Sequence, residues 1–93
     1  MKLYEISFSK NFSKSLKRLL KSGSFDNAKL NSIINSIASG DILPYSTRDH
    51  VLKANWAGYR ECHIETDLLL IYKIENNKLA LSYLGTHSEL FDK

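Results

Sequence analysis

The sequence contains little cysteine, proline or glycine, and it has no long hydrophobic run. Its 93 residues include a single cysteine, Cys62, which excludes an internal disulfide framework and a zinc site built from several cysteines. One proline and four glycines exclude a collagen-like or proline-rich chain. The longest apolar run, Leu68 to Tyr72, is far below the roughly 20 residues that span a bilayer, and residues 1–10 alternate in polarity rather than forming a signal-peptide core. We therefore expect a cytoplasmic protein that is neither secreted nor inserted in a membrane.

The remaining composition is that of a small folded domain with an uneven charge. Hydrophobic residues make up 43% of the chain and charged residues 25%, which is enough apolar material for one core, so residues 1–93 are expected to form one domain. Residues 1–30 carry seven Lys or Arg and two acids, whereas residues 61–93 carry three and six. This basic front third favours an acidic partner, either a nucleic acid or an acidic protein.

The N-terminal half has the patterns of one strand followed by two helices. Residues 3–8 alternate in polarity, as a strand with a buried face does. A helix is expected from the N-cap Ser9 to Gly23, and a second from the N-cap Asp26 to Gly40. Apolar residues recur at helical spacing in both, namely Phe12, Leu16, Leu19 and Leu20 in the first and Leu30, Ile33, Ile34 and Ile37 in the second. The two helices are expected to form an antiparallel hairpin.

Lysines lie opposite the apolar stripe of the first expected helix. They are Lys10, Lys14, Lys17 and Lys21, with Arg18 at the edge of the group. Such a face is either solvated or a contact surface for phosphate or an acidic partner, and the sequence leaves both interpretations open.

The C-terminal half has the pattern of a sheet. Residues 41–50 contain Pro44 and no sustained periodicity, which indicates a loop that can pair briefly with the sheet. Strands are expected over residues 59–65, 68–74 and 79–84, the second buried on both faces, with a tight turn at Asn76 and Asn77. Alternation in the last strand places Tyr83 on the face of Leu79 and Leu81. The expected fold is α+β with the order βααβββ and a mainly antiparallel sheet.

Three histidines, His50, His63 and His87, lie near strand ends or loops of this fold. If the sheet brings them together, their imidazoles can supply both a general base and a general acid. A metal site that includes Asp67 is the rival interpretation, but no HxH or HxxxH pair is present to preorganise it, so no metal is expected. Alternation turns Cys62 away from His63 and toward the core, which favours a structural thiol over a nucleophile.

Residues Asp49 to Phe91 read DH-x-L-x5-GYR-x2-HI-x2-DLLLIYK followed by LGTHSELF. This combination resembles the YafQ group of the RelE/ParE toxin superfamily, and the resemblance covers nearly the whole chain. It implies the RelE-like fold and a ribosome-dependent mRNA endonuclease that a cognate antitoxin neutralises. The catalytic candidates that it implies are His50, His63, Asp67 and His87, with Phe91 stacking on or positioning an RNA base.

The chemistry implied is attack by the 2′-OH of the RNA itself, without a metal or another cofactor. We expect His50 as base, His87 as acid, and His63 as electrostatic stabiliser or alternate base, although these roles can be permuted. Asp67 is expected to hold an imidazole in one tautomer or raise its pKa. Glu61 shares the His63 face by strand alternation and is expected to orient that ring.

One residue departs from the family pattern. Members of the group often have an arginine two residues ahead of the glycine of GTHS, where this chain has Tyr83. Tyr83 is left as a hydrogen-bonding RNA contact that carries no charge. Arg60, on the opposite strand face from His63, is either an RNA contact or half of an ion pair at the core edge, and Trp56 is expected in the core.

Two other functions stay open. The first is a ParE-like toxin that binds a protein target such as DNA gyrase and cuts no RNA, because this fold does not fix function. The second is a homologue that binds an antitoxin but cleaves weakly, for which Tyr83 is the sequence hint. The three histidines argue against the first, since a toxin that only binds a protein target needs no acid and base.

Overall fold

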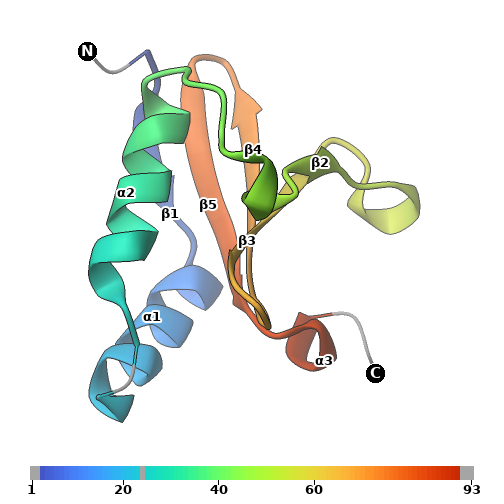
Figure 1. Cartoon of the computed structure of the whole chain (residues 1–93). Coiled ribbons are helices and arrows are strands. Elements are labelled where there is room, and N and C mark those ends of the chain that lie inside the picture. The colour runs from blue at the N-terminus through green and yellow to red at the C-terminus, as the bar shows by residue number, and fades with distance from the viewer. Residues whose placement is uncertain (1–2, 24, 91–93) are drawn as a thin grey trace.

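The chain forms two layers, a five-stranded sheet and two helices that cover one of its faces (Figure 1). This computed structural model describes residues 3–23 and 25–90. The strands are β1 (Glu5–Phe8), β2 (His50–Val51), β3 (Arg60–Glu65), β4 (Leu68–Glu75) and β5 (Lys78–Gly85). The helices are α1 (Lys10–Ser22), α2 (Asn27–Ala38) and α3 (His87–Leu90), with 3-10 turns η1 (Tyr45–Thr47) and η2 (Ala54–Trp56).

The strand order is β1-β5-β4-β3-β2, with β1 parallel to β5 and the other pairs antiparallel. The expected α+β class, the order of the main elements and the central, doubly buried β4 are confirmed. The brief pairing of the 41–50 loop is also confirmed, as β2. The short helix α3 was not expected.

The ends of both long helices follow from their capping residues. The Ser9 hydroxyl accepts a hydrogen bond from the Phe12 N–H, and the Asp26 carboxylate accepts one from the Lys29 N–H. Each bond satisfies one of the N–H groups that a helix start leaves without a backbone partner. Gly23 ends α1 in the left-handed region, with φ of 80°, as its position predicted.

The core lies between the helices and the inner face of the sheet. It contains Phe12, Leu30, Ile33, Ile34, Ile37, Cys62, Ile64, Leu68, Leu70, Tyr72, Leu79, Leu81 and Leu84. Leu16 and Leu19 are only partly buried against it, and Leu20 is 51% exposed. Leu20 therefore lies at the edge of the apolar stripe of α1 and outside the core.

A β-bulge in β5 overturns the expected direction of Tyr83. Ile71 pairs with Tyr83 but Tyr72 pairs with Leu81, so Ser82 is an extra residue in the ladder. The bulge reverses the alternation, and Leu84 joins Leu81 in the core while Tyr83 lies on the outer face. The Ser82 carbonyl accepts a 2.5 Å hydrogen bond from the Ser9 hydroxyl, which ties the bulge to the start of α1.

Cys62 is fully buried in β3, as expected of a structural thiol. Burial, with a smaller contribution from nearby carboxylates, raises the pKa of its thiol to about 12. The reactive thiolate is therefore scarce at neutral pH.

Among the described residues, no helix is both long and apolar enough to cross a membrane.

Shortening a core leucine should destabilise the fold far more than shortening an exposed one. Leu81 is 0% exposed, so Leu81→Ala should lower the free energy of unfolding by ~2 to 5 kcal/mol through lost burial and a residual cavity. Leu20→Ala is the matched control, with an expected loss of about 1 kcal/mol or less. Urea unfolding measures both, and equal losses would contradict the described core.

Candidate functional site

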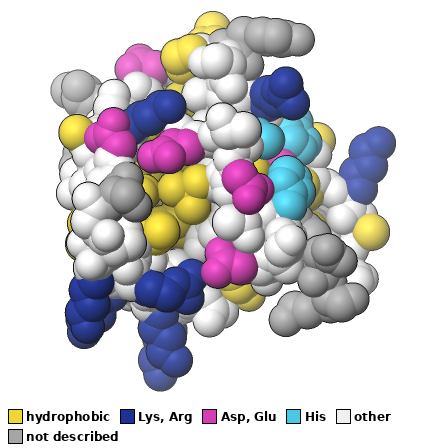
Figure 2. Space-filling view, turned by 60° about the horizontal axis from the view of Figure 1, so that its bottom comes forward, with side chains coloured by type: hydrophobic (Ala, Val, Ile, Leu, Met, Phe, Trp, Pro, Cys, Tyr) yellow, Lys and Arg dark blue, Asp and Glu magenta, His cyan; other side chains and the backbone are white. Residues whose placement is uncertain are grey.

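The structure brings the three histidines close together, with His50 and His63 beside the carboxylate of Glu61 and His87 beside His63. His50 Nε2 lies 3.3 Å from Glu61 Oε1, and His63 Nε2 lies 4.0 Å from the same oxygen. The rings of His63 and His87 face each other at a tilt, with their centroids 5.9 Å apart. Figure 2 shows the histidine side chains gathered in one patch with an acidic side chain against them. One connected cluster therefore contains all three imidazoles.

The strand register explains why these residues meet. His50 pairs with Glu61, Glu61 with Ile71, and Ile71 with Tyr83, which forms one row across four strands. In a neighbouring row, His63 pairs with Leu69 and Leu69 with Gly85. Directly paired residues point to the same face, so the polar groups stand beside a floor of Leu69 and Ile71, both fully buried.

An ion pair at the edge of the sheet anchors His50. Arg60 donates to both carboxylate oxygens of Asp49, at 3.2 and 3.1 Å, and the Tyr72 hydroxyl donates to Asp49 at 2.7 Å. The bond to Asp49 raises the Arg60 pKa, and burial with the same bond raises the Tyr72 pKa, so both remain donors. Of the two interpretations of Arg60, the ion pair is the one that the structure shows. Asp49 and Tyr72 therefore help to position His50, although the sequence pattern had assigned neither residue a role.

Both ring nitrogens of His50 face oxygen acceptors. Nδ1 lies 2.6 Å from the Arg48 carbonyl oxygen, and Nε2 faces Glu61, which is only 4% exposed. For both contacts to be hydrogen bonds, the ring must carry two protons or Glu61 must be protonated. The His50–Glu61 pair is thus a place where a proton can be held or accepted, at the edge of the cluster.

A capping box fixes His87 at the start of α3. The Glu89 N–H donates to the Thr86 hydroxyl at 3.2 Å, and the Thr86 N–H donates to the Glu89 carboxylate at 2.9 Å. Arg18 of α1 pairs with the same carboxylate at 3.1 Å. A Cβ on Gly85 would lie 2.8 Å from Glu89 Oε1, so a larger residue at this position would displace the Glu89 carboxylate. The T-x-x-E pattern was readable in the sequence and would have predicted both α3 and Glu89.

The aromatic residues near the cluster form an outer group rather than part of the core. The Trp56 ring packs edge-on against Tyr83, with centroids 5.1 Å apart, and against Tyr59 at 5.6 Å. Trp56 is half-buried and lies outside the core, so the expectation for it is wrong. The cause is η2, which carries it over the outer face, where the bulge also puts Tyr83. Phe91 lies outside the described residues.

Asp67 lies apart from the Glu61 contacts. It is exposed in the turn between β3 and β4 and lines a hollow with Thr66, Thr86 and Phe25. The carboxylate placed against two of the imidazoles is that of Glu61, and its role in orienting His63 stays a prediction. A role for Asp67 in orienting an imidazole stays a prediction. Among residues 3–23 and 25–90, no group of three or more His, Cys, Asp or Glu has an arrangement that would hold a metal ion.

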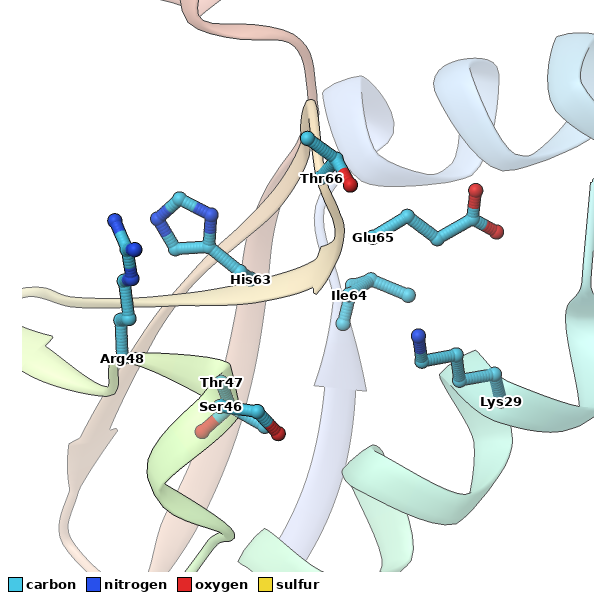
Figure 3. A pocket seen from close by; sticks show the side chains of 8 residues that line it. All are labelled: Lys29, Ser46, Thr47, Arg48, His63, Ile64, Glu65 and Thr66. Carbon is cyan, nitrogen blue, oxygen red and sulfur yellow. The ribbon is translucent and has the colours of Figure 1, made fainter.

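Two hollows flank the imidazoles. One lies between the loop before β2 and the end of β3, and it is lined by His63, Arg48, Lys29, Ser46, Glu65 and Thr66, among others (Figure 3). The other is lined by Tyr83, Trp56, Lys14, Arg18 and Glu89, among others, beyond the end of β1. Each contains two cations and one acid. The cluster can therefore supply proton transfer, with basic side chains on both sides.

Known proteins with this sequence pattern have the same fold. A family model described as the bacterial toxin of type II toxin-antitoxin systems, YafQ, matches residues 4–92. The mRNA interferase toxin YafQ of Escherichia coli strain B / BL21-DE3 is 36% identical over 88 residues, which are 94% of this chain and 95% of the relative.

Solved structures agree with that match. The E. coli DinJ-YafQ toxin-antitoxin complex aligns with a TM-score of 0.86 and 34% identity, over 96% of this chain and 98% of that one. A copper-bound mutant toxin from Helicobacter pylori aligns with a TM-score of 0.90 and 38% identity, over 95% and 99%. Fold, length and sequence thus agree, and this chain belongs to the YafQ family of bacterial type II toxin-antitoxin toxins.

Proposed function

We propose that this chain is a ribosome-dependent mRNA endonuclease, the toxin of a type II pair, and that it acts in the cytoplasm on mRNA held by the ribosome. The observation that carries the proposal is a cluster of three imidazoles, in which His50 and His63 lie against the buried Glu61 carboxylate and His87 lies beside His63. The names of the E. coli relatives, mRNA interferase toxin YafQ, support the substrate class.

The reaction is a transfer within the RNA. The 2′-oxygen attacks the adjacent phosphorus, the bond from phosphorus to the 5′-oxygen breaks, and the products are a 2′,3′-cyclic phosphate and a free 5′-OH. One proton must leave the 2′-OH and one must reach the 5′-oxygen, so a base and an acid are required. No metal or other cofactor enters this balance.

The cluster offers a residue for each role. When neither His50 Nε2 nor Glu61 Oε1 carries a proton, this pair can accept the proton of the 2′-OH. His87, at the exposed start of α3, donates a proton to the leaving oxygen. His63 stands between them and stabilises charge on the phosphate. Phe91, two residues short of the chain's last residue, is assigned to stacking on an RNA base, and Tyr83 to a hydrogen bond with the RNA.

We further propose that the antitoxin occupies an apolar groove along α1. Phe8, Phe12, Leu16 and Leu20 line this groove, with Phe8 62% exposed, and Lys14 and Lys17 border it. An amphipathic segment with apolar anchors and acidic flanks matches this arrangement. The E. coli relative forms a complex with DinJ, which supports a partner of this kind.

The charge on α1 should speed this association. Lys17→Glu reverses one border charge, so the association rate with the cognate antitoxin should fall and its dependence on salt should weaken. Stopped-flow fluorescence at several ionic strengths measures both quantities. Leu20→Ala, which removes an apolar contact and no charge, should instead raise the dissociation rate. Association that ignores both ionic strength and Lys17→Glu would place the antitoxin elsewhere.

Removing the acid should stop cleavage and leave the fold intact. His87→Gln keeps approximate size and hydrogen bonding but delivers no proton at neutral pH, so cleavage of ribosome-bound mRNA should fall by ~10² or more. His50→Ala should also impair cleavage. The double variant should lose less than the product of the two single losses, because the groups act in one step. Single-turnover kinetics measures the rates, beside thermal unfolding of each variant.

The same assay contains the controls. Cleavage should persist with a chelator selective for transition metals, which leaves ribosomal Mg²⁺ in place; loss with the chelator and recovery with copper or zinc would favour a metal enzyme.

Asp67→Asn should reduce cleavage less than His87→Gln, because Glu61 is the carboxylate against the imidazoles. Wild-type rates in folded His50→Ala, His63→Ala and His87→Gln alike would refute the mechanism. If the wild-type chain binds the antitoxin but does not cleave mRNA, the alternative of a homologue with weak catalysis would be favoured.

A further inference from the structure

Arg48 is the one arginine whose side chain has no ion-pair partner among the described residues. The other two are occupied, since Arg18 pairs with Glu89 and Arg60 with Asp49. An exposed guanidinium with its donors free is suited to bidentate binding of a phosphate. Whether it can do so here depends on how close Arg48 lies to the imidazole cluster.

The Arg48 side chain extends alongside the ring of His63 (Figure 3). Both line one hollow, which Ser46, Glu65 and Lys29 also line, and the Glu65 carboxylate points away from Arg48 (Figure 3). His63 belongs to both the hollow and the imidazole cluster, whereas His87 does not line the hollow.

The backbone at Arg48 is held in an uncommon conformation. Its φ is 51°, in the left-handed region that non-glycine residues seldom occupy. In this conformation the Arg48 carbonyl accepts from His50 Nδ1 while the side chain enters the hollow. Local strain of this kind persists where the surrounding structure enforces it, and it is concentrated at functional sites.

We propose that Arg48 binds the backbone phosphate of the nucleotide next to the scissile one, with the Ser46 hydroxyl beside it. The proposal rests on the proposed nuclease function, because it assumes that the scissile phosphate lies among the imidazoles. A strand cut there and continuing past His63 enters the hollow with its next phosphate at Arg48. Arg48 would thus provide a positive charge for the RNA in a chain that has the uncharged Tyr83 where members of the family often have an arginine.

The test uses a single-stranded RNA oligonucleotide that spans a cleavage point first mapped on ribosome-bound mRNA. The oligonucleotide is 2′-O-methylated throughout and so resists cleavage. One neutral methylphosphonate is placed at each linkage in turn, and binding is followed by fluorescence anisotropy at several salt concentrations. Arg48→Gln should weaken binding roughly 10-fold and reduce the slope of log K against log salt by about 0.7, as the loss of one phosphate contact predicts. Arg48→Lys should keep the slope.

The sensitive linkage identifies the phosphate. Methylphosphonate at one linkage beside the cleavage point should weaken binding to the wild type and have no further effect on Arg48→Gln. Lys78→Gln removes the same charge at the start of β5, at the opposite end of that strand from Gly85 and α3, and should leave the slope unchanged. Arg48→Asn, which suits the left-handed backbone, should bind like Arg48→Gln and remain folded.

Three results would overturn the proposal. They are no saturable binding by the wild type, equal behaviour of Arg48→Gln and Lys78→Gln, and a sensitive linkage at the scissile position itself. Failure of the nuclease proposal is separate, because it would be seen as intact mRNA on ribosomes treated with the wild-type chain. The oligonucleotide measurement involves no cleavage and reports on Arg48 alone.

Discussion

The buried carboxylate of Glu61 is the group on which the candidate site depends. At 4% exposure it cannot be stabilised by water, and an unpaired charge in that position would be costly. Two imidazoles lie against it, with His50 Nε2 at 3.3 Å and His63 Nε2 at 4.0 Å from the same oxygen. Glu61 therefore provides one shared polar contact for histidines of two neighbouring strands. Removing Glu61 would release both rings at once.

The elements around Glu61 are fixed by contacts between segments far apart in sequence. Asp49 is bound to Arg60 and Tyr72, which sets the loop before β2 and hence His50. Thr86 and Glu89 form the capping box at the start of α3, and the Arg18–Glu89 ion pair links α3 to α1. The scaffold thus brings together one imidazole from the edge strand β2, one from the neighbouring strand β3 and one from the helix α3. Such placement on separate elements is typical of catalytic sites, in which a rigid sheet supports residues from its edges.

Local signals in the sequence were sufficient for the elements, and long-range contacts were not readable from them. The caps at Ser9 and Asp26, the stop at Gly23 and the doubly buried β4 follow from neighbouring residues alone. The bulge at Ser82 depends on pairing with β4 and on the bond from Ser9, so alternation alone misplaced Tyr83. The three histidines were predicted to come together, and Glu61 was predicted to share the face of His63. An ion pair was one of two alternatives for Arg60, but its partner Asp49 could not be named from the sequence.

The most direct test is a structure of this chain on a ribosome whose mRNA is 2′-O-methylated at the cleavage nucleotide, which blocks the attack and holds the substrate in place. The account predicts that the scissile phosphate lies among His50, His63 and His87, with the 2′-oxygen and the 5′-oxygen each within about 3 Å of an imidazole nitrogen. An mRNA strand that crosses another face of the chain, with its phosphates out of reach of all three rings, would contradict it.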